Sequence, residues 1–173
     1  MPLILVTPLS QVEAAIRRHK PSHLMTLLSP GHMIETPDGI RPGHHLRLGL
    51  NDVVATDIAN DPPNPKHVEE LIRFGRDWDA HAPLLIHCWA GVSRSMAAAY
   101  IVLCDRFGPF REKEIAKSVR ARAPHAYPNP LLVELADKAL GRNGRMSLAI
   151  ESIGRGTIVA EGEVVELPLS DEL

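Results

Sequence analysis

Two apolar segments separated by a short loop constrain the fold of this chain most strongly. Residues 83–87 are almost wholly apolar and have the length of a strand that is covered on both faces. Residues 95–107 are apolar nearly all round and have the length of a buried helix. A doubly covered strand followed by a buried helix is typical of a mostly parallel sheet with helices on its faces. The sequence therefore predicts an α/β fold with a loop at a strand-to-helix junction.

The rest of the chain alternates between strand-like and helix-like patterns. Short apolar runs typical of strands occupy residues 3–6, 24–28 and 45–50. Apolar residues at helical spacing predict helices at 11–19, 65–78, 111–121, 130–140 and 145–153. Asn129 is suited to cap the fourth of these helices, with Pro130 at its first position.

The C-terminal tail fits two arrangements. Apolar residues at 157–159 and 164–165 fit an edge strand, and they also fit an arm packed on another subunit. We therefore expect one domain over residues 1–156 and a tail of uncertain structure over residues 157–173.

Charge and cysteine content exclude several classes of protein. The 173 residues include 19 basic and 21 acidic side chains, a net charge of −2, so no basic excess favours nucleic acid or an anionic membrane as a partner. The apolar stretch at the N-terminus is too short for a signal peptide or a membrane span. Two cysteines cannot form a disulfide framework. We therefore expect a cytoplasmic protein, and the oligomeric state stays open.

The junction loop has the sequence HCWAGVSRS over residues 87–95. A loop that joins a strand to a helix N-terminus directs several backbone N–H groups into one concavity, where the helix dipole adds partial positive charge. Such a concavity binds a tetrahedral dianion, and its field favours the thiolate form of Cys88. Arg94 can offer its planar fork to two phosphate oxygens, and Gly91 permits a sharp turn.

Two neighbouring side chains have supporting roles in this interpretation. Ser95 can donate a hydrogen bond to the sulfur of Cys88. Adjacent residues at a strand end point in opposite directions, so His87 is expected to fix the loop through backbone hydrogen bonds and to help keep Cys88 ionised, rather than to act as its base.

These residues resemble HCxxGxxR(S/T), the signature of the protein-tyrosine phosphatase superfamily. The form HCWAGVSRS is similar to that of dual-specificity and small bacterial phosphatases, and Pro128 with Asn129 resembles a pair that opens a helix in those enzymes. The resemblance implies a central, mostly parallel sheet flanked by helices and hydrolysis through a phosphocysteine without a cofactor. It assigns the nucleophile to Cys88 and phosphate binding to Trp89, Ala90, Gly91, Val92, Ser93 and Arg94.

Several other functions are compatible with the same loop. The chain could bind phosphorylated partners without turnover, or it could hydrolyse non-protein phosphate esters. Lipid and inositol phosphatases with this loop often carry lysines between the cysteine and the arginine, and this chain has none there. We therefore expect a protein-tyrosine or dual-specificity phosphatase whose partner is a phosphorylated protein or a small phosphate ester.

The general acid has three candidates, Asp52, Asp57 and Asp61. The resemblance places the acid just after the strand that precedes the helix before the signature, which favours Asp52. The family's usual spacing of slightly over thirty residues before the cysteine favours Asp57. We assign the acid to Asp52 because the prolines at 62–65 are typical of a loop insertion that lengthens the spacing.

The remaining histidines and the second cysteine do not predict a metal site. The histidine pairs lack the spacing of metal ligands, and the cysteines are too far apart in sequence for a zinc knuckle. We therefore expect no metal, and we expect Cys104 to be a small buried hydrophobic residue of the apolar helix.

Overall fold

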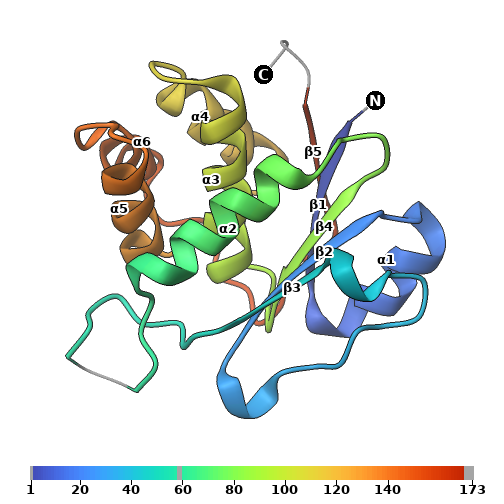
Figure 1. Cartoon of the computed structure of the whole chain (residues 1–173). Helices are drawn as coiled ribbons and strands as arrows, with labels where there is room; N and C mark the ends of the chain where they lie inside the picture. The colour runs from blue at the N-terminus through green and yellow to red at the C-terminus, as the bar shows by residue number, and fades with distance from the viewer. Residues whose placement is uncertain (1, 58–59, 170–173) are drawn as a thin grey trace.

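Five strands of the computed structural model form one sheet in the order β3–β2–β4–β1–β5 (Figure 1). The structure describes residues 2–57 and 60–169. The strands are β1 (Leu3–Pro8), β2 (His23–Leu28), β3 (His45–Gly49), β4 (Leu84–Cys88) and β5 (Val165–Pro168). The first four pair in parallel, whereas β5 pairs with β1 in the antiparallel direction.

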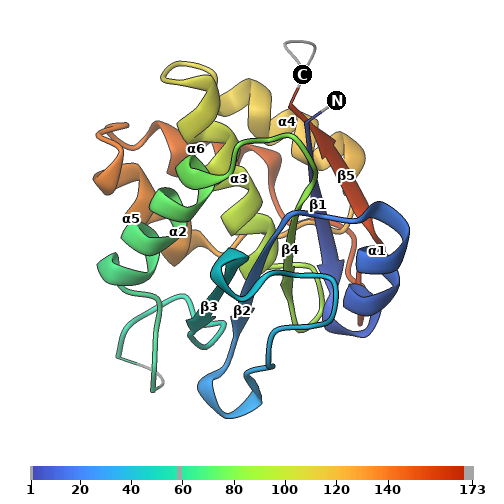
Figure 2. The same cartoon turned by 45° about the vertical axis from the view of Figure 1, so that its right-hand side comes forward.

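Helices cover both faces of the sheet (Figures 1 and 2). The helix α1 (Val12–His19) lies on one face. The other face carries α2 (Pro65–Asp77), α3 (Arg94–Phe107), α4 (Glu112–Arg122), α5 (Pro130–Ala139) and α6 (Arg145–Ile153). Short 3-10 turns occupy Leu9–Gln11, Pro30–His32 and Pro42–His44. The predicted α/β fold with a mostly parallel, helix-flanked sheet is confirmed.

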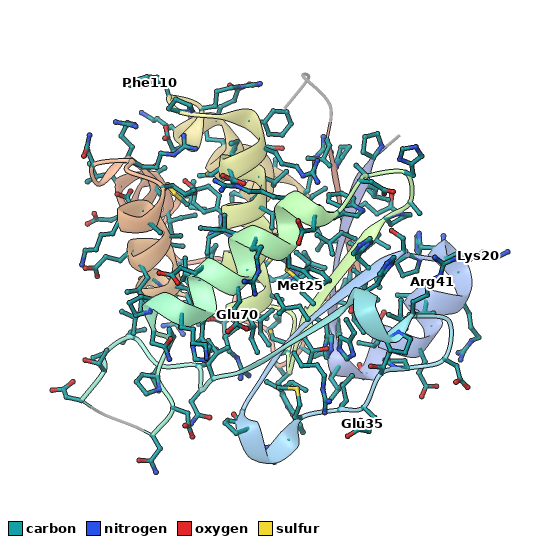
Figure 3. The ribbon with its side chains drawn as sticks, in the orientation of Figure 1. Lys20, Met25, Glu35, Arg41, Glu70 and Phe110 are labelled. Atoms are coloured by element: carbon teal, nitrogen blue, oxygen red, sulfur yellow. The ribbon has the colours of Figure 1, made fainter. Side chains whose placement is uncertain are left out.

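Alternating side chains of the strands build two apolar layers. Leu5, Leu24 and Leu85 pack with Ile16 of α1 on one face. On the other face, residues such as Met25, fully buried, pack towards α2 and α3 (Figure 3). By contrast, Phe110 is 80% exposed and projects at the edge of the helical layer (Figure 3). Side chains alternate between the two faces because the strand is pleated. Burial on both faces explains why β4 contains almost only apolar residues.

The strand register brings the carboxyl ends of the central strands together. In the parallel pair of β1 and β4, Thr7 lies opposite His87 and Pro8 opposite Cys88. Thr26 of β2 lies opposite His87 from the other side. The loop after Cys88 therefore begins at the edge of the sheet where the parallel strands end, which is where α/β proteins commonly bind ligands.

The tail contributes one edge strand to this sheet, and that strand begins later than the apolar residues at 157–159 would allow. Within the tail, Val165–Pro168 is the part that pairs with β1, whereas residues 157–159 lie outside any strand. The reason is that Thr157 donates its N–H to the carbonyl of Pro124 (2.8 Å), which holds this part of the tail away from the sheet edge. No helix in the described ranges is long and apolar enough to span a membrane.

Asp137 of α5 fixes the start of α6, the helix that leads into the tail. Its carboxylate accepts hydrogen bonds from the backbone N–H groups of Gly144 (2.6 Å), Met146 (2.7 Å) and Ser147 (3.4 Å). Asp137 is buried, and Gly144 adopts a φ of +83°, so the carboxylate replaces acceptors that the turn before α6 does not supply.

We predict that Asp137→Ala lowers the free energy of unfolding by roughly 1–3 kcal/mol, because it leaves buried N–H groups without an acceptor. Urea denaturation measures the change. Lys138→Ala is the matched control, since the neighbouring Lys138 side chain is exposed and makes a surface ion pair with Glu134. Equal losses in the two variants would contradict the capping role.

Candidate active site

The signature loop spans the gap between β4 and α3. Cys88 is the last residue of β4 and Arg94 is the first residue of α3, so residues 89–93 form the turn between them. This is the strand-to-helix junction that the sequence predicts, and it places the loop at the N-terminus of a buried helix.

Carbonyl groups of the loop bond outward to segments that are distant in sequence. Trp89 accepts from the N–H of Leu9 (3.1 Å), and Ala90 accepts from the N–H of Gly162 (2.8 Å). Further along the loop, Val92 accepts from the N–H of Tyr127 (2.9 Å). The N–H groups of residues 89–93 have no acceptor among the described residues. These N–H groups are therefore available to an anion.

Gly91 is required by its conformation and by its surroundings. Its φ is +70°, a region that residues with a side chain rarely adopt. A Cβ atom at this position would lie 2.7 Å from the backbone N of Pro8 and 2.9 Å from the carbonyl carbon of Thr7. The end of β1 therefore packs directly against the loop, and only glycine fits between them.

Cys88 and Arg94 are both nearly buried at the base of the loop. The sulfur of Cys88 lies 3.1 Å from the hydroxyl oxygen of Ser95, within hydrogen-bond distance. One terminal nitrogen of Arg94 donates to the carbonyl of Leu50 (2.9 Å), while its Nε is buried without a partner in the described part of the chain. The guanidinium is thus held at one end and retains a buried donor for a ligand.

Asp52 is positioned from two directions. Its Oδ1 accepts from the hydroxyl of Ser93 (2.7 Å) and from the side-chain amide of Asn129 (2.8 Å). Asn129 also caps α5 by accepting from the N–H of Leu132 (3.0 Å), and its amide donates to the carbonyl of Val53 (3.0 Å). The predicted cap residue of α5 therefore also fixes the loop that carries Asp52.

A hollow of about 460 Å³ brings most of the predicted site residues together, whereas the predicted Gly91, His87 and Ser95 are not among its lining residues. It is lined by Asp52, Cys88, Trp89, Ala90, Val92, Ser93 and Arg94, and in addition by Val54, Tyr127, Pro130 and Val159. Asp57 and Asp61 are not among its lining residues. The sequence did not indicate that Val54, Tyr127, Pro130 and Val159 line the hollow, because these residues come from separate segments of the chain and follow no motif.

His87 belongs to a buried hydrogen-bonded chain behind the loop. Its Nδ1 lies 3.3 Å from the carbonyl of Cys88, and its Nε2 lies 2.7 Å from the hydroxyl of Thr26. The same hydroxyl contacts Nε2 of His45 (2.8 Å), whose Nδ1 contacts the hydroxyl of Thr36 (2.9 Å). Because a carbonyl only accepts, His87 donates from Nδ1. This fixes the donor and the acceptor in every other hydrogen bond of the series.

His45 and His87, the two histidines of this hydrogen-bonded series, are neutral at neutral pH. Burial lowers the pKa of His87 to about 4, and burial with the nearby charge of Arg47 lowers the pKa of His45 to about 4. His87 therefore contributes a hydrogen bond to the backbone at Cys88 rather than a positive charge. Among the described residues its ring nitrogens contact the hydroxyl of Thr26 and this carbonyl, which is consistent with a structural role rather than a base.

The second cysteine lies away from the hollow, inside α3. Cys104 is fully buried, and burial raises its pKa to about 12, so it stays a thiol. Within the described residues no group of three or more His, Cys, Asp or Glu side chains could hold a metal ion.

The buried state of His87 predicts a stability that depends on pH. The unfolded chain takes up a proton at this side chain near pH 6.5, whereas the folded chain resists it down to about pH 4. Stability therefore falls as the pH drops through this window. We expect His87→Asn to remove about 2 kcal/mol of the loss in unfolding free energy between pH 7 and pH 5, measured by urea denaturation.

The exposed His81 provides the control for this measurement. His81→Asn should retain the full loss of stability between the two pH values. An unchanged loss in His87→Asn would show that this imidazole does not resist protonation in the folded protein.

Comparison with known proteins connects this geometry to a fold. No family model and no curated protein matches the sequence. Among solved structures, DUSP15 has a TM-score of 0.63 and 18% identity, covering 88% of this chain and 92% of its own. Human DUSP28 has a TM-score of 0.59 and 18% identity, covering 82% and 94%. PTPMT1, solved in complex with PI(5)P, has a TM-score of 0.57 and 15% identity, covering 87% and 93%. The chain therefore has the α/β fold of the dual-specificity and protein-tyrosine phosphatases.

Proposed function

We propose that this protein is a phosphate monoester hydrolase that acts through a phosphocysteine, as a protein-tyrosine or dual-specificity phosphatase. One observation carries the proposal: the loop after β4 turns its carbonyls outward and leaves its N–H groups free around Cys88, beside the buried Nε of Arg94. A thiol, a guanidinium and several N–H groups that have no acceptor among the described residues match the charge of a phosphate dianion.

In the first step the thiolate of Cys88 attacks phosphorus, a sulfur–phosphorus bond forms, and the bond to the leaving oxygen breaks in line. Asp52 gives its proton to that oxygen. The loop N–H groups and Arg94 stabilise the charge on the three equatorial oxygens without reorganisation, which is the electrostatic contribution that usually dominates catalysis.

In the second step water attacks phosphorus, Asp52 takes its proton, and the sulfur–phosphorus bond breaks to release inorganic phosphate. The hydroxyl of Ser95, 3.1 Å from the sulfur, is placed to stabilise the departing thiolate. Both steps use residues of this chain alone.

Two observations bear on the alternatives. A module that binds phosphate without turnover has no need of a nucleophile and a carboxylate at one hollow, and this chain places Cys88 and Asp52 there. PTPMT1 was solved with a phosphoinositide. The loop of this chain carries no lysine for additional phosphates. The absence of such a lysine favours a substrate with one phosphate group.

Replacement of the nucleophile tests the proposal directly. We expect the wild type to hydrolyse p-nitrophenyl phosphate and Cys88→Ser to lose all measurable turnover while it still binds vanadate or phosphate, because a serine hydroxyl is scarcely ionised at neutral pH. Cys104→Ala is the matched control and should keep its activity, since Cys104 is buried away from the hollow. Phosphate binding by a wild type without turnover would instead identify a binding module.

The acid is tested by comparing two aspartates of the same loop. We expect Asp52→Asn to reduce turnover of phosphotyrosine by roughly 10² or more, because a poor leaving group needs a proton, and to reduce turnover of p-nitrophenyl phosphate less. Wild-type activity should fall as the pH rises above the pKa of the acid, and Asp52→Asn should flatten this decline. Asp57→Asn should retain it. The reverse pattern would assign the acid to Asp57.

A further inference from the structure

The segment that joins α6 to β5, residues 154–164, runs from the helical layer across to the sheet (Figure 2). We call it the strap. It is fixed at both ends and along its length: Arg120 donates to the carbonyl of Gly154 (2.8 Å), Thr157 donates to the carbonyl of Pro124 (2.8 Å), and Ser10 donates to the carboxylate of Glu161. The strap is therefore a defined part of the structure with contacts to several elements.

The strap touches the signature loop itself. The N–H of Gly162 donates to the carbonyl of Ala90 (2.8 Å). Gly162 is buried, and a Cβ atom there would lie 2.5 Å from Nε2 of His125 and 3.2 Å from the carbonyl oxygen of Gly91. The close approach fixes the position of the strap relative to the bottom of the hollow.

Three residues before Gly162, the strap supplies a side chain to the hollow. Val159 is 39% exposed and lines it together with Cys88. The neighbouring Ile158 is 78% exposed and is not among the lining residues. Adjacent strap residues thus have different environments, one in the hollow and one in solvent.

Exposed apolar side chains concentrate at this hollow. Seven large hydrophobic residues are exposed in the described part of the chain, and four of them line it: Val54, Trp89, Tyr127 and Val159. These four come from the loop after β3, the signature loop, the segment before α5 and the strap. An exposed apolar cluster around a polar base marks a site that binds a ligand with a charged end and an apolar body.

We propose that Val159 of the strap is a specificity-determining residue of this site, selecting phosphate esters whose carbon framework beside the phosphate is broad and apolar. The inference rests on the proposed function, because it concerns the body of the ester whose phosphate enters the signature loop. An apolar group that covers Val159 removes surface from water at about 25 cal/mol per Å². A contact of some tens of Å² then changes kcat/KM by roughly threefold to tenfold.

The test compares 1-naphthyl phosphate with phenyl phosphate. Both are aryl esters with similar leaving groups, so the ratio of their kcat/KM values reports the contact of the second ring. We expect the wild type to favour the naphthyl ester, and we expect Val159→Ser to reduce this preference by roughly threefold to tenfold. Ile158→Ser is the matched control on the adjacent exposed residue and should leave the ratio unchanged.

Two results would overturn the inference. One is an unchanged ratio in Val159→Ser, and if both esters lose activity equally the residue only holds the loop. The other is the same drop in the ratio in Ile158→Ser. The binding constants of the two esters for Cys88→Ser, with and without Val159→Ser, give the same comparison without turnover. Absence of hydrolysis by the wild type would therefore count against the proposed function, whereas equal binding of the two esters would count against the role of Val159.

Discussion

The outward hydrogen bonding of the signature loop is the constraint on which the site depends. Three of the five residues between β4 and α3 turn their carbonyl groups to the segment after β1, the strap and the segment before α5, where the N–H groups of Leu9, Gly162 and Tyr127 donate to them. A peptide unit that points its carbonyl outward directs its N–H inward, so the concave surface is set by partners outside the loop. The rest of the fold holds these partners at fixed positions around Cys88.

Much of the architecture and the base of the site could be predicted from the sequence, because both depend on local patterns. The apolar run before Cys88 and the apolar helix after it fix the strand-to-helix junction, and the cap residue Asn129 gives the start of α5. The remainder depends on contacts between residues distant in sequence. Nothing near Asp52 indicates that Asn129 holds its carboxylate, and nothing near Val159 indicates a place in the hollow.

The tail shows why an apolar pattern alone did not settle its structure. Residues 157–159 have the composition of a strand, but Thr157 is bonded to Pro124, and the strand forms only at Val165–Pro168, where β1 offers a free edge. Backbone pairing at a sheet edge depends on which edge remains open, and that is decided by the order of all the strands. Which residues of the tail form the strand and which form the strap could therefore be decided only from the complete fold.

The bond between Gly162 and Ala90 also has a consequence for how the protein matures. During synthesis the chain emerges from its N-terminus, and the segment with Cys88 and Arg94 is available for folding well before the strap and β5. Until residue 162 has left the ribosome, the carbonyl of Ala90 lacks its partner and the sheet lacks its last strand. The nascent chain therefore carries Cys88 in a loop that lacks one of its hydrogen-bond partners, and the loop is completed only when the strap docks.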